Sequence, residues 1–83
     1  MSKYTPLKNY LAGLPPITRD TTLTFEQIER IINDKLPPSA HVHRAWWANE
    51  VEGMHTHARA WIDVGWCVDA ISQIQKWVRF RRL

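Results

Sequence analysis

The chain has 83 residues, which suffice for one hydrophobic core but not for two, because each half would bury too little apolar surface. Its composition of 45% hydrophobic, 11% aromatic and 23% charged residues excludes a disordered, low-complexity or collagen-like segment. A formal net charge of +3 weakly favours a polyanionic partner. We therefore predict a single small, basic domain over residues 1–83.

The cysteine content and the hydropathy of the chain indicate its compartment. Cys67 is the single cysteine, so no intrachain disulfide can form, and its neighbours Trp66 and Val68 predict a buried thiol. No apolar run approaches the roughly 18 residues of a membrane span, and the N-terminus does not open on a signal-peptide stretch. We expect a soluble, cytoplasmic protein that does not bind membranes.

The first forty residues predict two helices with a short strand between them. Apolar residues at helical spacing favour a first helix that Thr5 caps. Residues 22–24 favour a brief strand. Thr24 and Gln27 form a capping box, which predicts that a second helix runs over residues 25–33.

The middle of the chain predicts less regular structure, and the sequence leaves the conformation of residues 36–55 open. Two prolines end the second helix, and Ser39 would cap a further turn that runs toward Trp47. Thr56 is expected to cap a third helix that ends at Gly65. The side chains expected to face solvent from that helix are His57, Arg59, Ala60 and Asp63.

The last eighteen or so residues alternate between apolar and polar side chains, which predicts a C-terminal β-hairpin with its turn near residues 72–75. In the second strand, Val78 and Phe80 would point into the core. The side chains then left on the opposite face, or close to it, are Lys76, Trp77, Arg79, Arg81 and Arg82.

The order of these elements predicts the fold class. Helix, strand, helix, helical segment, strand and strand is the order of an α+β, winged helix-turn-helix-like fold, in which a C-terminal β-hairpin closes three helical segments. The stretch of about twenty residues between the second and third helices is longer than the tight turn usual in that motif. A chain this short could gain stability as a homodimer, which symmetrical DNA sites usually require.

Four motifs occur in order along the chain: Leu36-Pro37-x-Ser39-Ala40, Trp46-Trp47-x-Asn49, Ala60-Trp61 followed by Gly65-Trp66, and the terminal Phe80-Arg81-Arg82. In this order they resemble a family of small, largely uncharacterised bacterial and phage-associated domains. The resemblance covers nearly the whole chain and implies a stand-alone domain. It implies no activity and no catalytic residue.

The distribution of charge predicts a nucleic-acid-binding surface. The whole excess of positive charge lies after His55, where five Lys or Arg residues oppose two Asp residues. On the last strand, arginines would neutralise phosphates while Trp77 packs on a sugar or base. The third helix would approach the DNA groove as the reading helix. We expect a small regulator that binds duplex DNA rather than RNA, and the residues expected to bind it are Thr56, His57, Arg59, Lys76, Trp77, Arg79, Arg81 and Arg82.

Two other interpretations of the same residues stay open. The arginines could belong to a solvated edge strand whose charges prevent aggregation. Alternatively, the chain is a protein-interaction module, for example a phage or bacterial inhibitor that engages an acidic partner through exposed Trp and Arg.

The adjacent residues Trp46 and Trp47 bear on that second function. Two neighbouring tryptophans cannot both face fully inward on a regular helix or strand, so one is expected to be exposed. That ring would be a stacking platform or a binding hot spot, with Asn49 supplying hydrogen bonds. In the alternative interpretation, one ring belongs to the core and the other covers a loop, with Asn49 in a turn.

No pattern predicts catalysis or a cofactor. The His-x-His pairs, His41 with His43 and His55 with His57, match no standard zinc framework. Cys67 has bulky apolar neighbours, and the chain contains no Gly-rich phosphate loop, nucleophile elbow or paired acids. We expect a protein that is not an enzyme and holds no metal.

Overall fold

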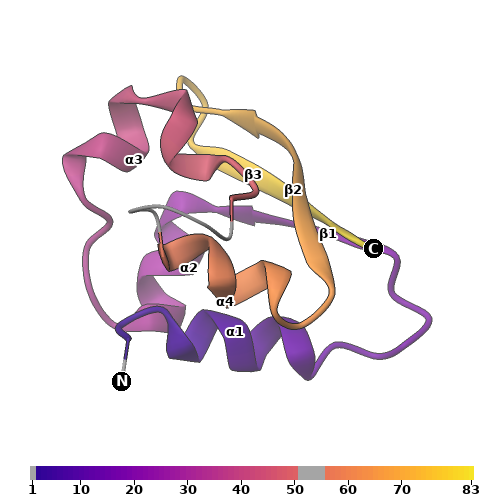
Figure 1. Ribbon diagram of the computed structural model, residues 1–83. Coiled ribbons are helices and arrows are strands. Elements are labelled where there is room, and N and C mark those ends of the chain that lie inside the picture. Colours follow the sequence, from indigo (N-terminus) through magenta and orange to yellow (C-terminus); the bar gives the residue numbers. More distant parts are fainter. Residues whose placement is uncertain (1, 51–55) are drawn as a thin grey trace.

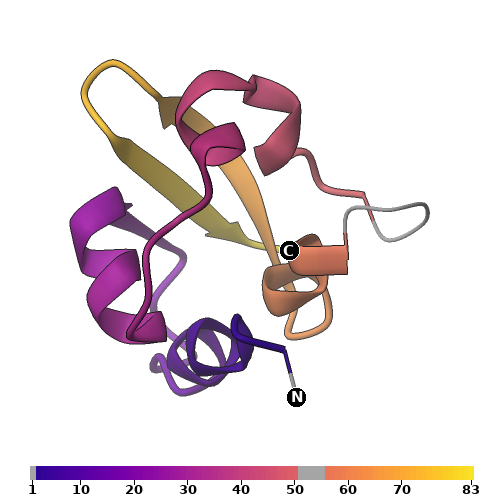
Figure 2. The same ribbon diagram turned by 90° about the vertical axis from the view of Figure 1, so that its left-hand side faces the viewer.

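The computed structural model describes residues 2–50 and 56–83, with only the backbone described at Thr56. It is an α+β fold, a three-stranded antiparallel sheet with short helices gathered on one side (Figures 1 and 2). In chain order the elements are α1 (Thr5–Ala12), β1 (Asp20–Thr24), α2 (Phe25–Ile32), α3 (Pro38–Val42), η1 (Arg44–Trp47), η2 (Thr56–Ala58), α4 (Arg59–Ile62), β2 (Trp66–Ser72) and β3 (Trp77–Arg82), where η denotes a 3₁₀ helix. The C-terminal hairpin is confirmed.

The last strand, β3, is the middle strand of the sheet. The strand order is β1-β3-β2, and both pairings are antiparallel. Between Val68 and Ala70 the register of β2 against β3 shifts, which leaves Asp69 without a partner residue across the pair. Such a β-bulge bends the strand and changes the direction of the extra side chain. The strict alternation predicted along β2 is therefore wrong at this point.

The core lies between the inner face of the sheet and the helices. Val78 and Phe80 are fully buried, as predicted from their alternation. Trp61 of α4 and Trp66 of β2 are also fully buried, and the rings of Trp61 and Phe80 lie 5.6 Å apart. Helix α1 packs against both α2 and α4. Aromatic side chains thus supply much of the area that a chain of this length must bury.

Trp46 and Trp47 are both buried, with 7% and 2% of their surfaces exposed, so the expectation that one is exposed is wrong. They occupy a 3₁₀ turn, η1, where successive side chains diverge by about a third of a turn. Trp47 stacks on Phe25 and donates its indole N–H to the carbonyl of Ala40 at 2.9 Å. Trp46 stacks on the ring of His57 with a centroid distance of 3.8 Å. Each ring therefore has its own partner inside the protein.

Four predicted caps can be compared with the helix starts. The capping box of α2 is confirmed, because the backbone N–H of Gln27 donates to Thr24 Oγ1 and Gln27 Oε1 accepts from the backbone N–H of Thr24. The other three predicted caps are wrong. Tyr4, not Thr5, is the N-cap of α1, Ser39 lies inside α3, and Thr56 is the first residue of η2.

The third helix is shorter than predicted. It consists of the 3₁₀ turn η2 and four residues of α4, and Ala60, expected to face solvent, is buried. Ala58 and Trp61 are buried as well. Within residues 2–50 and 56–83, none of the helices has the length and apolar character needed to cross a bilayer.

We predict that Thr24→Ala lowers the free energy of unfolding by about 1 kcal/mol more than Thr22→Ala, as measured by urea denaturation. Both threonines are exposed on β1 and lose the same strand preference, but Thr24 alone caps α2. Equal losses in the two variants would show that the cap does not stabilise the fold.

Candidate binding surface on the sheet

The face of the sheet that points away from the helices carries the predicted arginine cluster. Trp77, Arg79 and Arg81 alternate along β3 with the buried Val78 and Phe80, so they project from this outer face. The ribbon views place the helices together on the opposite, inner side (Figures 1 and 2). We call Asp69, Trp77, Arg79 and Arg81 the outer-face cluster.

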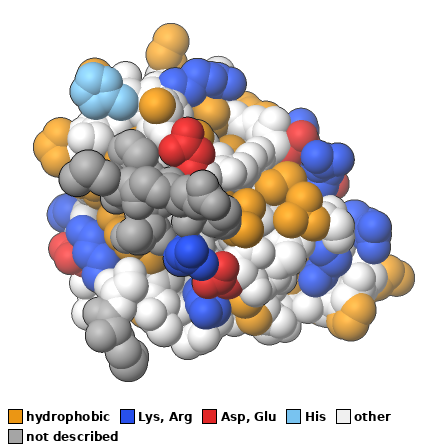
Figure 3. Space-filling view, in the orientation of Figure 1, with side chains coloured by type: hydrophobic (Ala, Val, Ile, Leu, Met, Phe, Trp, Pro, Cys, Tyr) orange, Lys and Arg blue, Asp and Glu red, His pale blue; other side chains and the backbone are white. Residues whose placement is uncertain are grey.

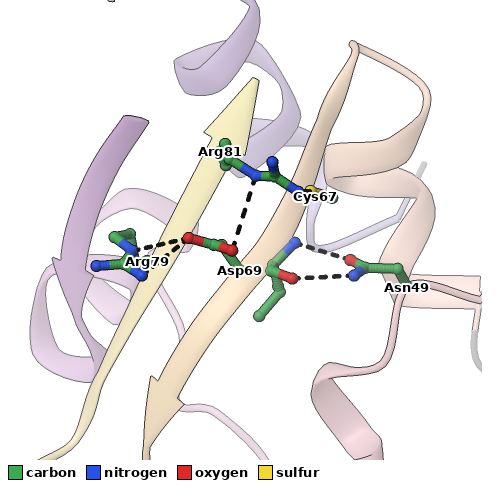
Figure 4. A network of polar contacts seen from close by, with 6 residues as sticks. Asn49, Cys67, Asp69, Arg79 and Arg81 are labelled. Atoms are coloured by element: carbon green, nitrogen blue, oxygen red, sulfur yellow. Dashed lines mark hydrogen bonds and ion pairs between the residues drawn. The ribbon is translucent and has the colours of Figure 1, made fainter. Parts of the chain in front are cut away.

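Asp69 links the two arginines of the outer-face cluster (Figure 4). Its Oδ2 accepts from Arg79 Nε at 3.0 Å and Nη2 at 2.9 Å, and its Oδ1 lies 3.7 Å from Arg81 Nε. The side chains of Arg79 and Arg81 are 45% and 60% exposed. The carboxylate therefore holds both guanidinium groups in place and offsets one of their two charges. Sequence patterns did not reveal this role, because it depends on the bulge at Asp69.

Trp77, the aromatic member of the outer-face cluster, and the neighbouring Cys67 are both partly or fully covered. Trp77 is half-buried, and its indole N–H donates to Gln75 Oε1 at 3.0 Å. Cys67 is buried, as predicted, and its Sγ lies 3.9 Å from Arg81 Nη2. The arginine thus covers the thiol, and only part of the Trp77 ring faces solvent.

Arg82, a predicted binding residue, does not lie on the outer face with Arg79 and Arg81. It pairs with Trp66 in the hairpin register, and its guanidinium lies over the Trp66 ring, 4.4 Å from the centroid. It also donates to the carbonyls of Thr18 at 2.9 Å and Pro15 at 3.0 Å. These contacts tie the loop before β1 to the end of the sheet, so Arg82 is a structural residue.

Lys76 lies at the end of the hairpin turn and is directed differently from the arginines. Its backbone is left-handed, with φ of 61°, and its carbonyl accepts from the backbone N–H of Phe25 at 2.9 Å. The residue lines an open cleft of about 700 Å³ beside α2, whose lining includes both acidic and basic side chains. Lys76 is therefore exposed next to the outer-face cluster, in surroundings of mixed charge.

The predicted reading residues lie on the other side of the sheet. Thr56, His57 and Arg59 belong to η2 and α4, which pack on the inner face with α1. His57 is half-buried against Trp46, and its Nε2 donates to the Trp46 carbonyl. Arg59 forms an ion pair with Asp63 at 3.4 Å. The structure thus does not bring these residues onto the face that carries the outer-face cluster.

A pocket of about 220 Å³ lies between the start of α1 and α4. Its lining includes Lys8, Arg59 and Asp63, so its charges are mixed. Burial, with a smaller effect of Asp34, raises the pKa of Tyr4 in this region above its ordinary value of 10.0. The pocket is smaller than the roughly 300 Å³ from which ligand sites usually begin, and we assign it no ligand.

Asn49, a predicted partner-binding residue, is exposed, but its side-chain amide is engaged by hydrogen bonds within the chain. Its Oδ1 accepts from the backbone N–H of Val68 at 2.8 Å and from the indole N–H of Trp61 at 3.0 Å. Its Nδ2 donates to the Val68 carbonyl at 3.0 Å. The amide therefore pairs with the outer edge of β2 as a neighbouring strand would (Figure 4).

The histidines show no metal-binding arrangement in the part of the chain that the structure describes, where no three His, Cys, Asp or Glu side chains gather around a common point. His41 packs its ring edge-on against Phe25 at 5.2 Å, and His43 is exposed. His55 lies outside the described residues.

The visible surface has no single basic patch. Figure 3 shows Lys and Arg side chains in separate groups near the top, at the right and at the lower left, with acidic side chains beside several of them. Five ion pairs join such groups in the described residues, including those of the outer-face cluster. Positive and negative side chains are therefore interspersed on this face.

We predict that Asn49→Ala lowers the free energy of unfolding by about 2 kcal/mol, because three hydrogen bonds are lost and two main-chain groups of Val68 lose their partner. Urea denaturation followed by tryptophan fluorescence measures the change. Asn9→Ala is the control, since Asn9 is exposed on α1 and alanine favours a helix. A loss no larger than that of the control would contradict the structural role.

Comparison with known proteins identifies the family of this chain. One family model, described as Domain of unknown function (DUF7662), matches residues 4–83. The match confirms the small uncharacterised domain family that the ordered motifs indicated. No curated protein matches the chain, and no solved structure matches it.

Proposed function

The chain belongs to this family, and from the geometry of its sheet we propose that it is a non-catalytic protein that binds duplex DNA through the outer-face cluster. The observation that carries the proposal is the presentation of Trp77, Arg79 and Arg81 from a sheet face that none of the described helices covers. All three side chains come from one rigid central strand, so their spacing does not depend on a loop.

The two arginines suit the phosphate backbone. Residues two apart on a strand project about 6.7 Å apart, so Arg79 and Arg81 can contact successive backbone groups rather than one. Asp69 engages one edge of the Arg79 guanidinium, which leaves the N–H groups of its other edge for a phosphate oxygen. Asp69 thus orients the donors while lowering their net charge.

The single aromatic of the cluster favours a duplex over a single strand. Proteins that bind single strands stack successive bases on several exposed rings. Here Trp77 is the one aromatic on the outer face in the part of the chain that the structure describes, and it is half-buried. We therefore propose that most contacts to DNA are made to phosphates and sugars. Binding would then depend little on base sequence.

A winged helix-turn-helix-like fold fits this proposal in part. The order of the elements and the β1-β3-β2 sheet agree with that fold, in which the β2-β3 hairpin is the wing. The reading helix predicted from the sequence corresponds to η2 and α4. Helix α4 has only four residues and packs against α1, which makes it a poor reading helix. We therefore assign the DNA contact to the hairpin and not to Thr56, His57 and Arg59.

Binding to an acidic protein surface is the second candidate function. The pair of arginines, already holding the Asp69 carboxylate, could equally hold carboxylates of a partner. The burial of Trp46 and Trp47 weighs against this function, because it removes the aromatic anchors expected for an interface.

We predict that the protein binds a short DNA duplex at low salt and that the affinity falls steeply as salt increases. Arg79→Ala and Arg81→Ala should each weaken binding about fivefold and reduce the salt slope by about 1. Fluorescence anisotropy with labelled duplex measures both effects. Absence of binding at low salt would rule the proposal out.

Two further variants make the test specific. Asp69→Asn removes the competing charge and should strengthen duplex binding about threefold. Arg30→Ala is the matched control, because Arg30 is an exposed arginine paired with Glu26 on α2, away from the sheet. If Arg30→Ala weakens binding as much as Arg79→Ala, the contact is diffuse attraction and not the outer-face cluster.

A further inference from the structure

The turn between β2 and β3 presents an aliphatic side chain to solvent. Ile74 is 94% exposed, the largest value among the exposed large hydrophobic residues described. The turn lies at the upper left of Figure 2 and near the top of Figure 1. One exposed aliphatic residue is common on a protein surface. The hydrogen bonds of the residues around Ile74 distinguish it from an ordinary exposed residue.

Every neighbour of Ile74 in the turn is held by an internal hydrogen bond. Gln73 Nε2 donates to the carbonyl of Ala40, and the backbone N–H of Gln75 donates to Ser72 Oγ. Gln75 Oε1 accepts from the Trp77 indole, and the Lys76 carbonyl accepts from α2. The turn is therefore fixed in place, with Ile74 directed into solvent and unable to fold back onto the core.

The same hairpin carries the arginines of the proposed DNA surface. Lys76 is the last residue of the turn, and Trp77, Arg79 and Arg81 follow along β3. A duplex that lies along the outer-face cluster would therefore meet the turn at one end of the contact. The minor groove is about 6 Å wide and admits a side chain at the tip of a turn but not a helix.

We propose that Ile74 is a wedge that enters the minor groove, partly unstacks one base step and bends the duplex. The inference rests on the proposed DNA-binding function and names how that surface acts. Aliphatic wedges of this kind kink DNA by 20–90° in proteins that bind the minor groove. A preformed turn suits the role, because a flexible turn would change its own conformation before the two base pairs unstack.

The wedge should change the shape of the DNA more than it changes affinity. Burial of an isoleucine gains a free energy comparable to the loss from unstacking one step, so the two effects nearly cancel. Removing the side chain should therefore weaken binding less than about fivefold while abolishing the bend. Flexible TA steps should be preferred over stiff A-tracts, because they are easier to unstack.

Energy transfer between dyes at the two ends of a duplex with a central TA step tests the wedge, with anisotropy on the same samples for affinity. Wild-type protein should bring the ends closer, and Ile74→Ala should bind without doing so. Ile74→Leu should restore the bend, because it restores an apolar side chain. Since Ile74 makes almost no contact with the core, these variants should fold as the wild type does.

Val42→Ala separates a wedge from a general apolar contact. Val42 is 70% exposed on α3, and the Gln73–Ala40 hydrogen bond holds that helix beside the turn. Val42→Ala should leave the bend intact. Three results would each show that Ile74 is not a wedge while leaving the DNA-binding proposal intact. They are binding of wild-type protein without bending, a bend with Ile74→Ala as large as that with wild-type protein, and a loss of the bend with Val42→Ala as large as that with Ile74→Ala. If the wild-type protein does not bind duplex at low salt, both proposals fail.

Discussion

The structure depends on the complete burial of Val78 and Phe80 in the middle strand of the sheet. Because side chains alternate along a strand, burying these two residues forces Trp77, Arg79 and Arg81 onto the outer face. The strand is also paired on both sides, so the positions of those side chains cannot drift as they would on an edge strand. A core constraint thus determines where the charged surface lies.

Neighbouring basic residues of this strand have distinct environments. Arg79 and Arg81 share one carboxylate on the outer face, and Arg82 turns inward to cover Trp66 and bind loop carbonyls. Lys76 lines a cleft of mixed charge beside α2. The run of positive charge at the end of the sequence is therefore not one surface, and the binding site that we propose is smaller than the run suggests.

Internal contacts also engage every named residue of the unusual Trp-Trp-x-Asn motif. Trp46 and Trp47 pack against rings from η2 and α2, segments far from them in sequence. Asn49 joins that layer to the sheet, because one side-chain oxygen accepts from both Trp61 and Val68. The motif is thus a link between the aromatic core and the edge of β2. Its polar and aromatic residues act together in stability.

Local patterns by themselves determined the capping box of α2, the C-terminal hairpin and the burial of Val78, Phe80 and Cys67. These features depend on residues a few positions apart, so spacing reveals them. The order of motifs along nearly the whole chain indicated the small uncharacterised family. Only the tertiary structure decided the bulge at Asp69, the inward turn of Arg82, the role of Asn49 and the placement of α4 behind the sheet. Each of these depends on contacts between segments distant in sequence, which no local pattern encodes.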